Sequence, residues 1–135
     1  MSVANREVVI RRKQGDGKPG ERTDIHVDAI SEDENSNYDV VTVIVEAKGC
    51  WNTGVDTAME EQLVGRYLLD NRCRHGIYLI GWFHCAQWDT SDPRFTLASP
   101  ADLPLTRHKF EDQAIELSGR ARKVVRAFVL DAALR

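Results

Sequence analysis

The chain has 135 residues, of which 42% are hydrophobic and 29% are charged. This length and balance predict one compact domain spanning residues 1–135. Eighteen Lys and Arg against 21 Asp and Glu give a net charge of −3, which excludes a uniformly basic surface but leaves a locally basic face open. No apolar run reaches the roughly 18 residues of a membrane span, and three scattered cysteines do not suggest a disulfide framework. We therefore expect a cytoplasmic protein without a membrane partner.

Three segments in the first half of the chain have the sequence pattern of β-strands. Residues 6–13 form the first, and a loop rich in Gly and Pro follows at 14–20. Residues 23–30 alternate apolar and polar side chains. Residues 39–48 are β-branched and almost wholly apolar, which is typical of a strand buried on both faces. The polar stretch 31–37 is typical of a surface loop, so we expect the two strands around it to pair.

The second half of the chain predicts a strand between two helices. Asp56 or Thr57 can cap the first helix, which ends near residues 71–75, before Gly76. Residues 77–83 form an apolar strand, so that strand, helix and strand make a parallel crossover. After a loop at 84–105, apolar residues recur at helical spacing over residues 110–128 and predict a long C-terminal helix. The expected fold is an α/β domain with a mixed central sheet flanked by helices.

Two charged residues interrupt the most hydrophobic segment of the chain. Glu46 and Lys48 are separated by one residue, so both side chains point to one face of the strand, about 7 Å apart. A charge buried there is costly unless it is paired or binds a metal. Both residues also lie at the carboxyl end of a strand that leads into a crossover helix, where open α/β sheets bind ligands. The alternative is a plain ion pair where the strand meets solvent.

Acidic residues on the preceding strand can complete this site. Asp24, His26 and Asp28 share one face of that strand, and one of the two aspartates is expected to face Glu46. The residues alone do not decide which. Two carboxylates near a lysine suit a hard cation such as Mg²⁺ and a phosphodiester, because the metal polarises the phosphate and lowers the pKa of a bound water. The lysine orients that water or stabilises the charge that develops on phosphorus.

Two segments resemble the motif of a known superfamily. Residues 20–24 (Gly-Glu-Arg-Thr-Asp) and 44–48 (Ile-Val-Glu-Ala-Lys) look like the motif of the PD-(D/E)XK nucleases, which share the restriction-endonuclease-like fold. The resemblance covers roughly residues 6–83 and implies a βββαβ core. Thr23 stands where the name of the superfamily has proline. By position, the resemblance implies that Asp24 and Glu46 are metal ligands, that the Ala47 carbonyl is the backbone ligand, and that Lys48 is the catalytic lysine.

The helix after this motif carries a further match. In the RecB-like branch of the superfamily, this helix holds Gln-x-x-x-Tyr. Here Gln62 is followed by Arg66 at the fourth position, and Tyr67 comes one residue later. On an α-helix, Gln62 and Arg66 share a face whereas Tyr67 is turned away by roughly 140°. The resemblance implies a catalytic role for Gln62 in positioning water or phosphate, and we expect Arg66 and Trp51, three residues past Lys48, to bind substrate.

These observations predict a Mg²⁺-dependent deoxyribonuclease, with Mn²⁺ as a substitute, and most simply a DNA endonuclease domain acting on single- or double-stranded DNA. The alternative is a catalytically silent module of the same fold that binds nucleic acid or a protein partner. The negative net charge and the absence of the first helix usual in the superfamily favour that alternative. A third interpretation is a domain, the C-terminal part of a larger protein, that cleaves only when its parent assembles. Other domains of that parent or a second copy of this chain then remain as partners.

Overall fold

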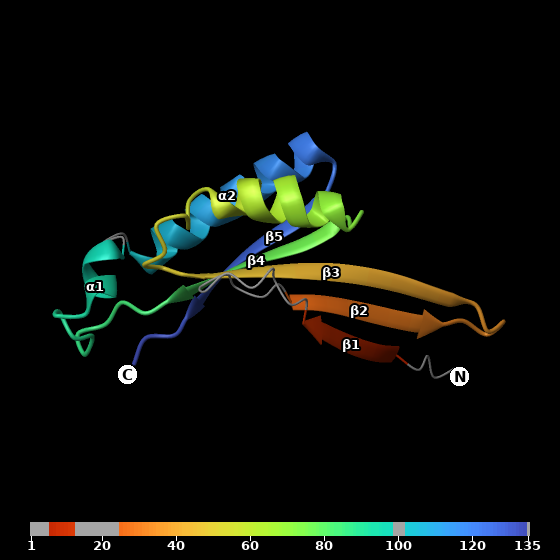
Figure 1. The fold of residues 1–135 in the computed structure, drawn as a ribbon, viewed down its shortest axis with the longest axis horizontal. Coiled ribbons are helices and arrows are strands. Elements are labelled where there is room, and N and C mark those ends of the chain that lie inside the picture. Colours follow the sequence, from red (N-terminus) through yellow and green to blue (C-terminus); the bar gives the residue numbers. More distant parts are fainter. Residues whose placement is uncertain (1–5, 13–24, 99–101, 135) are drawn as a thin grey trace.

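The computed structural model describes residues 6–12, 25–98 and 102–134, which form a five-stranded sheet in the order β1-β2-β3-β4-β5 (Figure 1). The strands are β1 (Arg6–Arg12), β2 (Ile25–Glu32), β3 (Tyr38–Gly49), β4 (His75–Trp82) and β5 (Val124–Asp131), and the helices are η1 (Met59–Leu68), α1 (Pro93–Leu97) and α2 (Leu103–Ala121). The first three strands pair antiparallel and the last three pair parallel. The prediction of an α/β fold with a mixed sheet is confirmed.

The pairing of β2 with β3 fixes which residues share a face. Ile25 lies opposite Val45, and His26 lies opposite Ile44. Because residues opposite one another point to the same face of a sheet, the even-numbered residues of β2 and β3 share one face. The predicted pairing of these two strands is confirmed, and so is the parallel crossover from β3 through η1 to β4.

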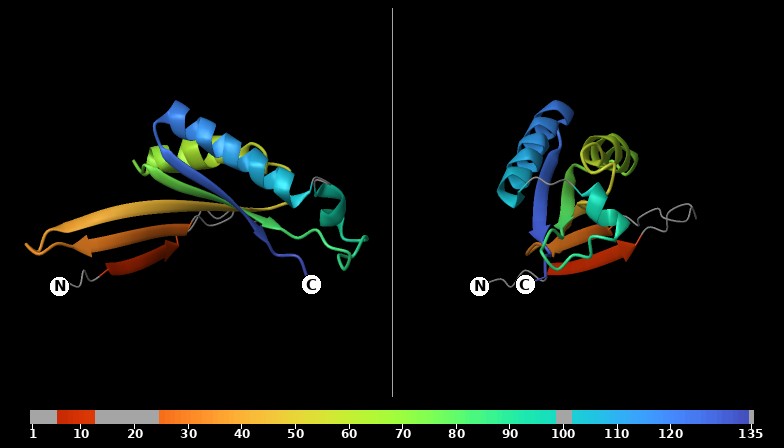
Figure 2. Two further views of the ribbon diagram at one scale, coloured as in Figure 1. Left: turned by 180° about the vertical axis from the view of Figure 1, so that it is seen from behind. Right: turned by 90° about the vertical axis from the view of Figure 1, so that its left-hand side faces the viewer.

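The core lies between the sheet and two helices. η1 packs against β3 and β4, and α2 packs against β5 and η1, on one side of the sheet (Figure 2). On β3 the even positions 44–48 are buried and the odd positions 43–47 are half-buried. Ile44, Leu63 and Tyr78 are wholly buried. Burying a Leu or Ile side chain contributes about 1.5–3 kcal/mol, so this layer holds the helices on the sheet.

The prediction that the central strand is buried on both faces is wrong. Residues 38–41 are exposed, and in the remainder of β3 only the face toward the helices is buried. The reason is the length of β3: the β2–β3 hairpin extends beyond the helices, which cover only the carboxyl half of the strand (Figure 1). A run of β-branched residues therefore indicates a strand here without indicating what covers it.

The prediction of one long helix up to residue 128 is also wrong at its end. α2 ends at Ala121, and Arg122 adopts a left-handed backbone conformation with φ of 53°. Residues 124–131 then form β5 beside β4. The spacing of Val124, Val125 and Phe128 fits a helix, but β-branched residues also favour strands. The free edge of β4 decides between the two, because it offers hydrogen bonds along the whole of β5. The short helix α1 also lies in the stretch 84–105, which was expected to be a loop.

η1 is a π-helix and not the expected α-helix. Hydrogen bonds from residue i to i+5 make its turns wider. Its buried residues, Met59, Leu63 and Leu68, are four and then five positions apart. A Cβ added at Gly65 would lie 3.0 Å from the carbonyl oxygen of Glu60, the residue five positions earlier. Glycine at position 65 therefore suits the π-helical backbone, because it has no Cβ to meet this carbonyl oxygen.

The loop before η1 is anchored by tertiary contacts and not by a helix cap. Ala58 occupies the N-cap position, and no side chain caps the helix there, so the predicted capping by Asp56 or Thr57 is wrong. Asp56 instead accepts a hydrogen bond from the ammonium of Lys109 on α2, at 2.6 Å. The hydroxyl of Tyr78 donates to the carbonyl of Val55 at 2.6 Å. These contacts tie the loop to α2 and β4.

Candidate functional site

Glu46, Lys48 and Gln62 form a cluster between β3 and η1. The Nζ atom of Lys48 lies 2.8 Å from Oε1 of Glu46 and donates a hydrogen bond of 2.8 Å to Oε1 of Gln62. The side chain of Glu46 is 2% exposed and that of Lys48 is 8% exposed. The two charges therefore share a face as predicted, and the alternative of an ion pair in solvent is wrong, because η1 covers them.

The surroundings of this cluster are apolar. Glu46 lies opposite Tyr78 and Lys48 opposite Ile80 in the β3–β4 register, and both β4 residues are at most 1% exposed. Taking two charges out of water is costly, and only good geometry with additional hydrogen bonds offsets that cost. Gln62 supplies one such hydrogen bond. The cluster is thus held together by its own polar contacts inside the core layer.

The carbonyl group of Ala47 is directed away from β4. The N–H of Cys50 donates to the carbonyl of Gly81 on β4, at 2.9 Å. Because successive residues of a strand direct their backbone groups to alternate sides, the peptide groups at odd positions of β3 are directed toward β2. Ile25, the first described residue of β2, lies opposite Val45. The Ala47 carbonyl is therefore directed to the side on which β2 begins.

The predicted acidic partner on β2 is described only in part. Asp24 lies outside the described residues. Asp28 does not face Glu46: it lies opposite Thr42, whose hydroxyl donates to its carboxylate at 2.6 Å. Of the two aspartates that the sequence leaves open, Asp28 is therefore excluded as the neighbour of Glu46. Across residues 25–98 and 102–134, no three side chains of His, Cys, Asp or Glu gather into a metal-binding group.

The π-winding of η1 changes where Tyr67 lies. In a π-helix, residues five apart come close to one side of the helix, so Tyr67 lies near the side of Gln62, and both are half-buried. The expected 140° separation assumed an α-helix and is wrong. Arg66 is exposed, and its guanidinium lies 5.7 Å from the centre of the Tyr67 ring. The five-residue spacing of the buried Leu63 and Leu68 is the sequence signal for this arrangement.

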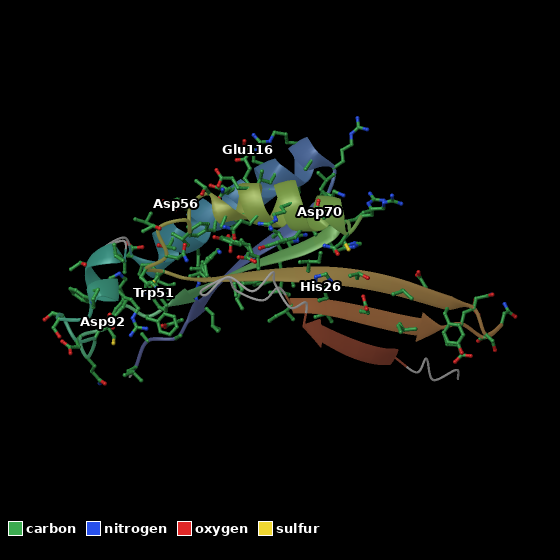
Figure 3. The ribbon with its side chains drawn as sticks, viewed as in Figure 1. His26, Trp51, Asp56, Asp70, Asp92 and Glu116 are labelled. Atoms are coloured by element: carbon green, nitrogen blue, oxygen red, sulfur yellow. The ribbon has the colours of Figure 1, made fainter. Side chains whose placement is uncertain are left out.

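Trp51 lies outside the cluster, on the other face of the sheet. Gly49 follows Lys48 and so faces away from it, and a Cβ added at Gly49 would lie 2.5 Å from the indole ring of Trp51. The indole therefore covers Gly49 at the carboxyl edge of β3, toward the α1 end of the molecule (Figure 3). The structure thus brings Glu46, Lys48 and Gln62 together, and leaves Arg66 exposed on η1 and Trp51 on the other face of the sheet.

No family model, curated protein or solved structure matches this chain. Among the helices that the structure describes, none combines the length and the apolar character needed to cross a membrane.

Proposed function

We propose that the chain is a Mg²⁺-dependent nuclease domain that hydrolyses the phosphodiester bonds of DNA. The observation that carries this proposal is the buried cluster of Glu46, Lys48 and Gln62 at the carboxyl end of β3. Apolar residues of similar volume often stabilise a core as well as a buried ion pair does, so charges retained here suggest a chemical role. The carboxyl end of a strand that enters a crossover helix is also where open α/β sheets bind ligands.

The oxygen donors fit a hard divalent cation. The carboxylate of Glu46 and the carbonyl of Ala47 are the kinds of ligand that Mg²⁺ takes. We assign the remaining carboxylate to Asp24, because it precedes Ile25 in the sequence, and Ile25 lies opposite Val45, the neighbour of Glu46. Mg²⁺ held by these groups, or Mn²⁺ in its place, would polarise the phosphate and lower the pKa of a bound water.

Lys48 and Gln62 act on the phosphate and the attacking water in this proposal. An ammonium group has three N–H donors: one binds the oxygen of Gln62, and the charge is paired with Glu46. We assign a further donor to a phosphate oxygen, where it stabilises the charge developing on phosphorus. The oxygen of Gln62 is held by Lys48, so its NH₂ group is the part that we assign to the water or the phosphate.

The winding of η1 supports the resemblance to the RecB-like branch. That branch has glutamine and tyrosine four positions apart, whereas Gln62 and Tyr67 are five apart. The wider turn of a π-helix brings residues at this longer spacing near one side. We therefore add Tyr67 to the proposed phosphate-binding groups, next to Gln62.

Cleavage of supercoiled plasmid and of single-stranded DNA, with Mg²⁺ or Mn²⁺, tests the proposal. The wild-type protein should cleave, and Lys48→Ala and Asp24→Ala should not. Lys48→Arg keeps the positive charge that Glu46 requires, so it should fold and still lose most activity. Lys109→Ala, which removes an exposed ion pair on α2, is the control that should cleave normally. Equal activity of the wild type and the Lys48 and Asp24 variants would refute the nuclease.

The burial of the cluster supports one alternative, a silent module that keeps the fold without turnover. Glu46 is 2% exposed, so a substrate reaches it only if η1 or its neighbours move. Titration with Mn²⁺ separates the two functions. A competent site should raise the melting temperature as Mn²⁺ increases, because a ligand that binds only the folded state stabilises it, and Asp24→Ala should abolish this rise. A silent module should show no Mn²⁺-linked stabilisation in either protein.

A further inference from the structure

A pocket with aromatic walls lies at the carboxyl edge of the parallel strands. Its volume is about 220 Å³. Three aromatic rings and three polar side chains form most of its lining: Trp51, Phe83, Trp88, Gln87, Asp89 and Arg94. The carboxyl edge of parallel strands is the common place for ligands in α/β proteins. This aromatic pocket is separate from the Lys48 cluster, because its walls cover the opposite face of the sheet.

Two paired glycines make room for the aromatic walls. Gly49 of β3 lies opposite Gly81 of β4. A Cβ at Gly49 would lie 2.5 Å from the Trp51 ring, and one at Gly81 would lie 2.6 Å from the Phe83 ring. The two rings therefore lie directly on the backbone of the sheet, with their centres 5.0 Å apart and their planes inclined by 51°. A side chain at either glycine would displace its ring.

Hydrogen bonds to one carboxylate, that of Asp92, hold the rest of the aromatic pocket. Asp92 accepts from the Trp88 indole at 3.3 Å and from the Arg94 guanidinium at 2.7 Å, and it also caps α1 through the N–H of Arg94. These hydrogen bonds, first those from Arg94, hold the pKa of Asp92 well below its ordinary value. The guanidinium of Arg94 lies 5.3 Å from the centre of the Trp51 ring. Trp51 and Asp92 are both seen at the α1 end of the molecule (Figure 3).

We propose that the aromatic pocket binds one unpaired nucleobase, which makes single-stranded DNA the preferred substrate of the nuclease. This inference rests on the proposed function. Aromatic faces bind bases by stacking whatever the sequence, because every base has a π-face. The volume of about 220 Å³ is smaller than the roughly 300–1,000 Å³ of pockets for drug-sized ligands. It therefore suits one ring system and not a folded peptide segment.

The position of the aromatic pocket fits a strand that crosses the edge of the sheet. Trp51 follows Lys48 by three residues, so their Cα atoms are at most about 11 Å apart. Once η1 or its neighbours move to open the cluster, a strand of DNA that crosses the carboxyl edge of β3 can place a phosphate beside Lys48 while a base of the same or the next nucleotide enters the pocket. Base pairing would prevent this, because a paired base is stacked inside the duplex.

The polar groups of the aromatic pocket indicate which bases fit. Asp89 accepts hydrogen bonds from the hydroxyl and the N–H of Ser91, at 2.7 and 2.8 Å, and these hold the pKa of Asp89 below its ordinary value. The ionised carboxylate only accepts hydrogen bonds, so it favours adenine, cytosine or guanine, which present amino donors, over thymine, which has no amino group. Arg94 over the Trp51 ring disfavours a cationic ligand, the other class that aromatic cages take.

Binding of fluorescently labelled single strands of about 12 nucleotides, measured by anisotropy without divalent cations, tests the inference. Phe83→Ala and Trp88→Leu should each weaken binding by about 5- to 100-fold, the range for loss of one stacked base. Ala132→Met should do the same by filling the pocket, which Ala132 lines, while leaving every ring in place. Tyr38→Ala is the matched control, because Tyr38 is an exposed aromatic residue at the far end of β3, and it should bind like wild type.

A strand with abasic sites in place of its bases completes the test. The wild-type protein should bind it as weakly as the Phe83→Ala protein binds the normal strand, and Phe83→Ala should cause no further loss. Equal binding of normal and abasic strands by the wild type would overturn the inference. So would quenching of tryptophan fluorescence by tetramethylammonium but not by deoxyguanosine, which would assign the pocket to cations. Because binding is measured without metal, a protein that binds bases but does not cleave would refute the nuclease and keep the pocket.

Discussion

The two halves of β3 are one strand with opposite environments. In the open half, residues 38–42, Tyr38 is 67% exposed and Val40 is 53% exposed. In the covered half, residues 43–49, Glu46 and Lys48 are 2% and 8% exposed. Apolar residues are thus in solvent while charged residues are in the core. Burial along this strand is therefore determined by where the helices cover it and not by how apolar its residues are. Charged residues under a helix need polar partners, whereas apolar residues in solvent need none.

The largest effect should come from breaking the ion pair of the covered half. Lys48→Ala leaves the carboxylate of Glu46 buried without its cation, and such a loss costs about 3–5 kcal/mol of unfolding free energy. Lys109→Ala breaks an ion pair whose side chains are 57% and 60% exposed, and should cost only about 0–1 kcal/mol. Urea unfolding measures both.

The double variant Glu46→Gln with Lys48→Met is the control for charge. It removes both charges at similar volume, so it should recover most of the stability that Lys48→Ala loses, because paired removal of a buried ion pair is often neutral. A double variant as unstable as Lys48→Ala would mean that lost packing, and not an unpaired charge, caused the effect.

Substitutions of apolar residues on one face of β3 should also have different effects in the covered half and in the open half. Ile44→Ala removes a wholly buried side chain and should cost about 2–5 kcal/mol. Val40→Ala changes a residue four positions earlier on the same face, and should change stability by no more than about 0.5 kcal/mol because the side chain is largely in solvent. Urea unfolding compares them. A loss from Val40→Ala as large as that from Ile44→Ala would show that something covers the open half in solution.

Two glycine-to-alanine substitutions, one in η1 and one in α2, should change the stability of the protein in opposite directions. Gly65→Ala should destabilise the protein by about 1 kcal/mol or more, because its Cβ would lie 3.0 Å from the carbonyl oxygen of Glu60. Gly119→Ala in the α-helix α2 meets nothing within 4 Å and should stabilise by roughly 0.5–1 kcal/mol. Thermal unfolding of the two variants measures the signs. Stabilisation by both would mean that η1 is wound as an α-helix.

The smallest effect should be local to the turn of the open half. Hydrogen bonds from Asn37, backbone first and then side chain, and from the N–H of Asn35 hold the pKa of Asp33 below its ordinary value. The stability that the ionised Asp33 carboxylate gives the turn is therefore present at neutral pH and is lost as the pH falls through the lowered pKa. Asp33→Ala should speed amide exchange in the β2–β3 hairpin at neutral pH and leave β4 unchanged. Hydrogen exchange followed by mass spectrometry measures the amide exchange rates of the β2–β3 hairpin and of β4.

Local pattern predicted the strands of the first half well and the burial of the site poorly. The alternation of residues 23–30 and the one-residue gap between Glu46 and Lys48 fix faces within single strands, so pairing and the shared face were predictable. Burial of Lys48 depends on η1, which is brought over it by tertiary packing. The sequence does not predict β5 for a similar reason, because Val124, Val125 and Phe128 satisfy helical spacing and become a strand only beside the edge of β4. Asp24 is the one predicted site residue that the structure does not describe.

The strands of the sheet stand in the same order as they occur in the chain, and this order has a consequence for folding. Each strand can join the edge left by the strand before it, so the sheet can grow in chain order. During synthesis from the N-terminus, the Lys48 cluster needs only the chain as far as β4. The aromatic pocket also needs Ala132 and Leu134 from the end of the chain. We therefore expect the Lys48 cluster to form before the aromatic pocket.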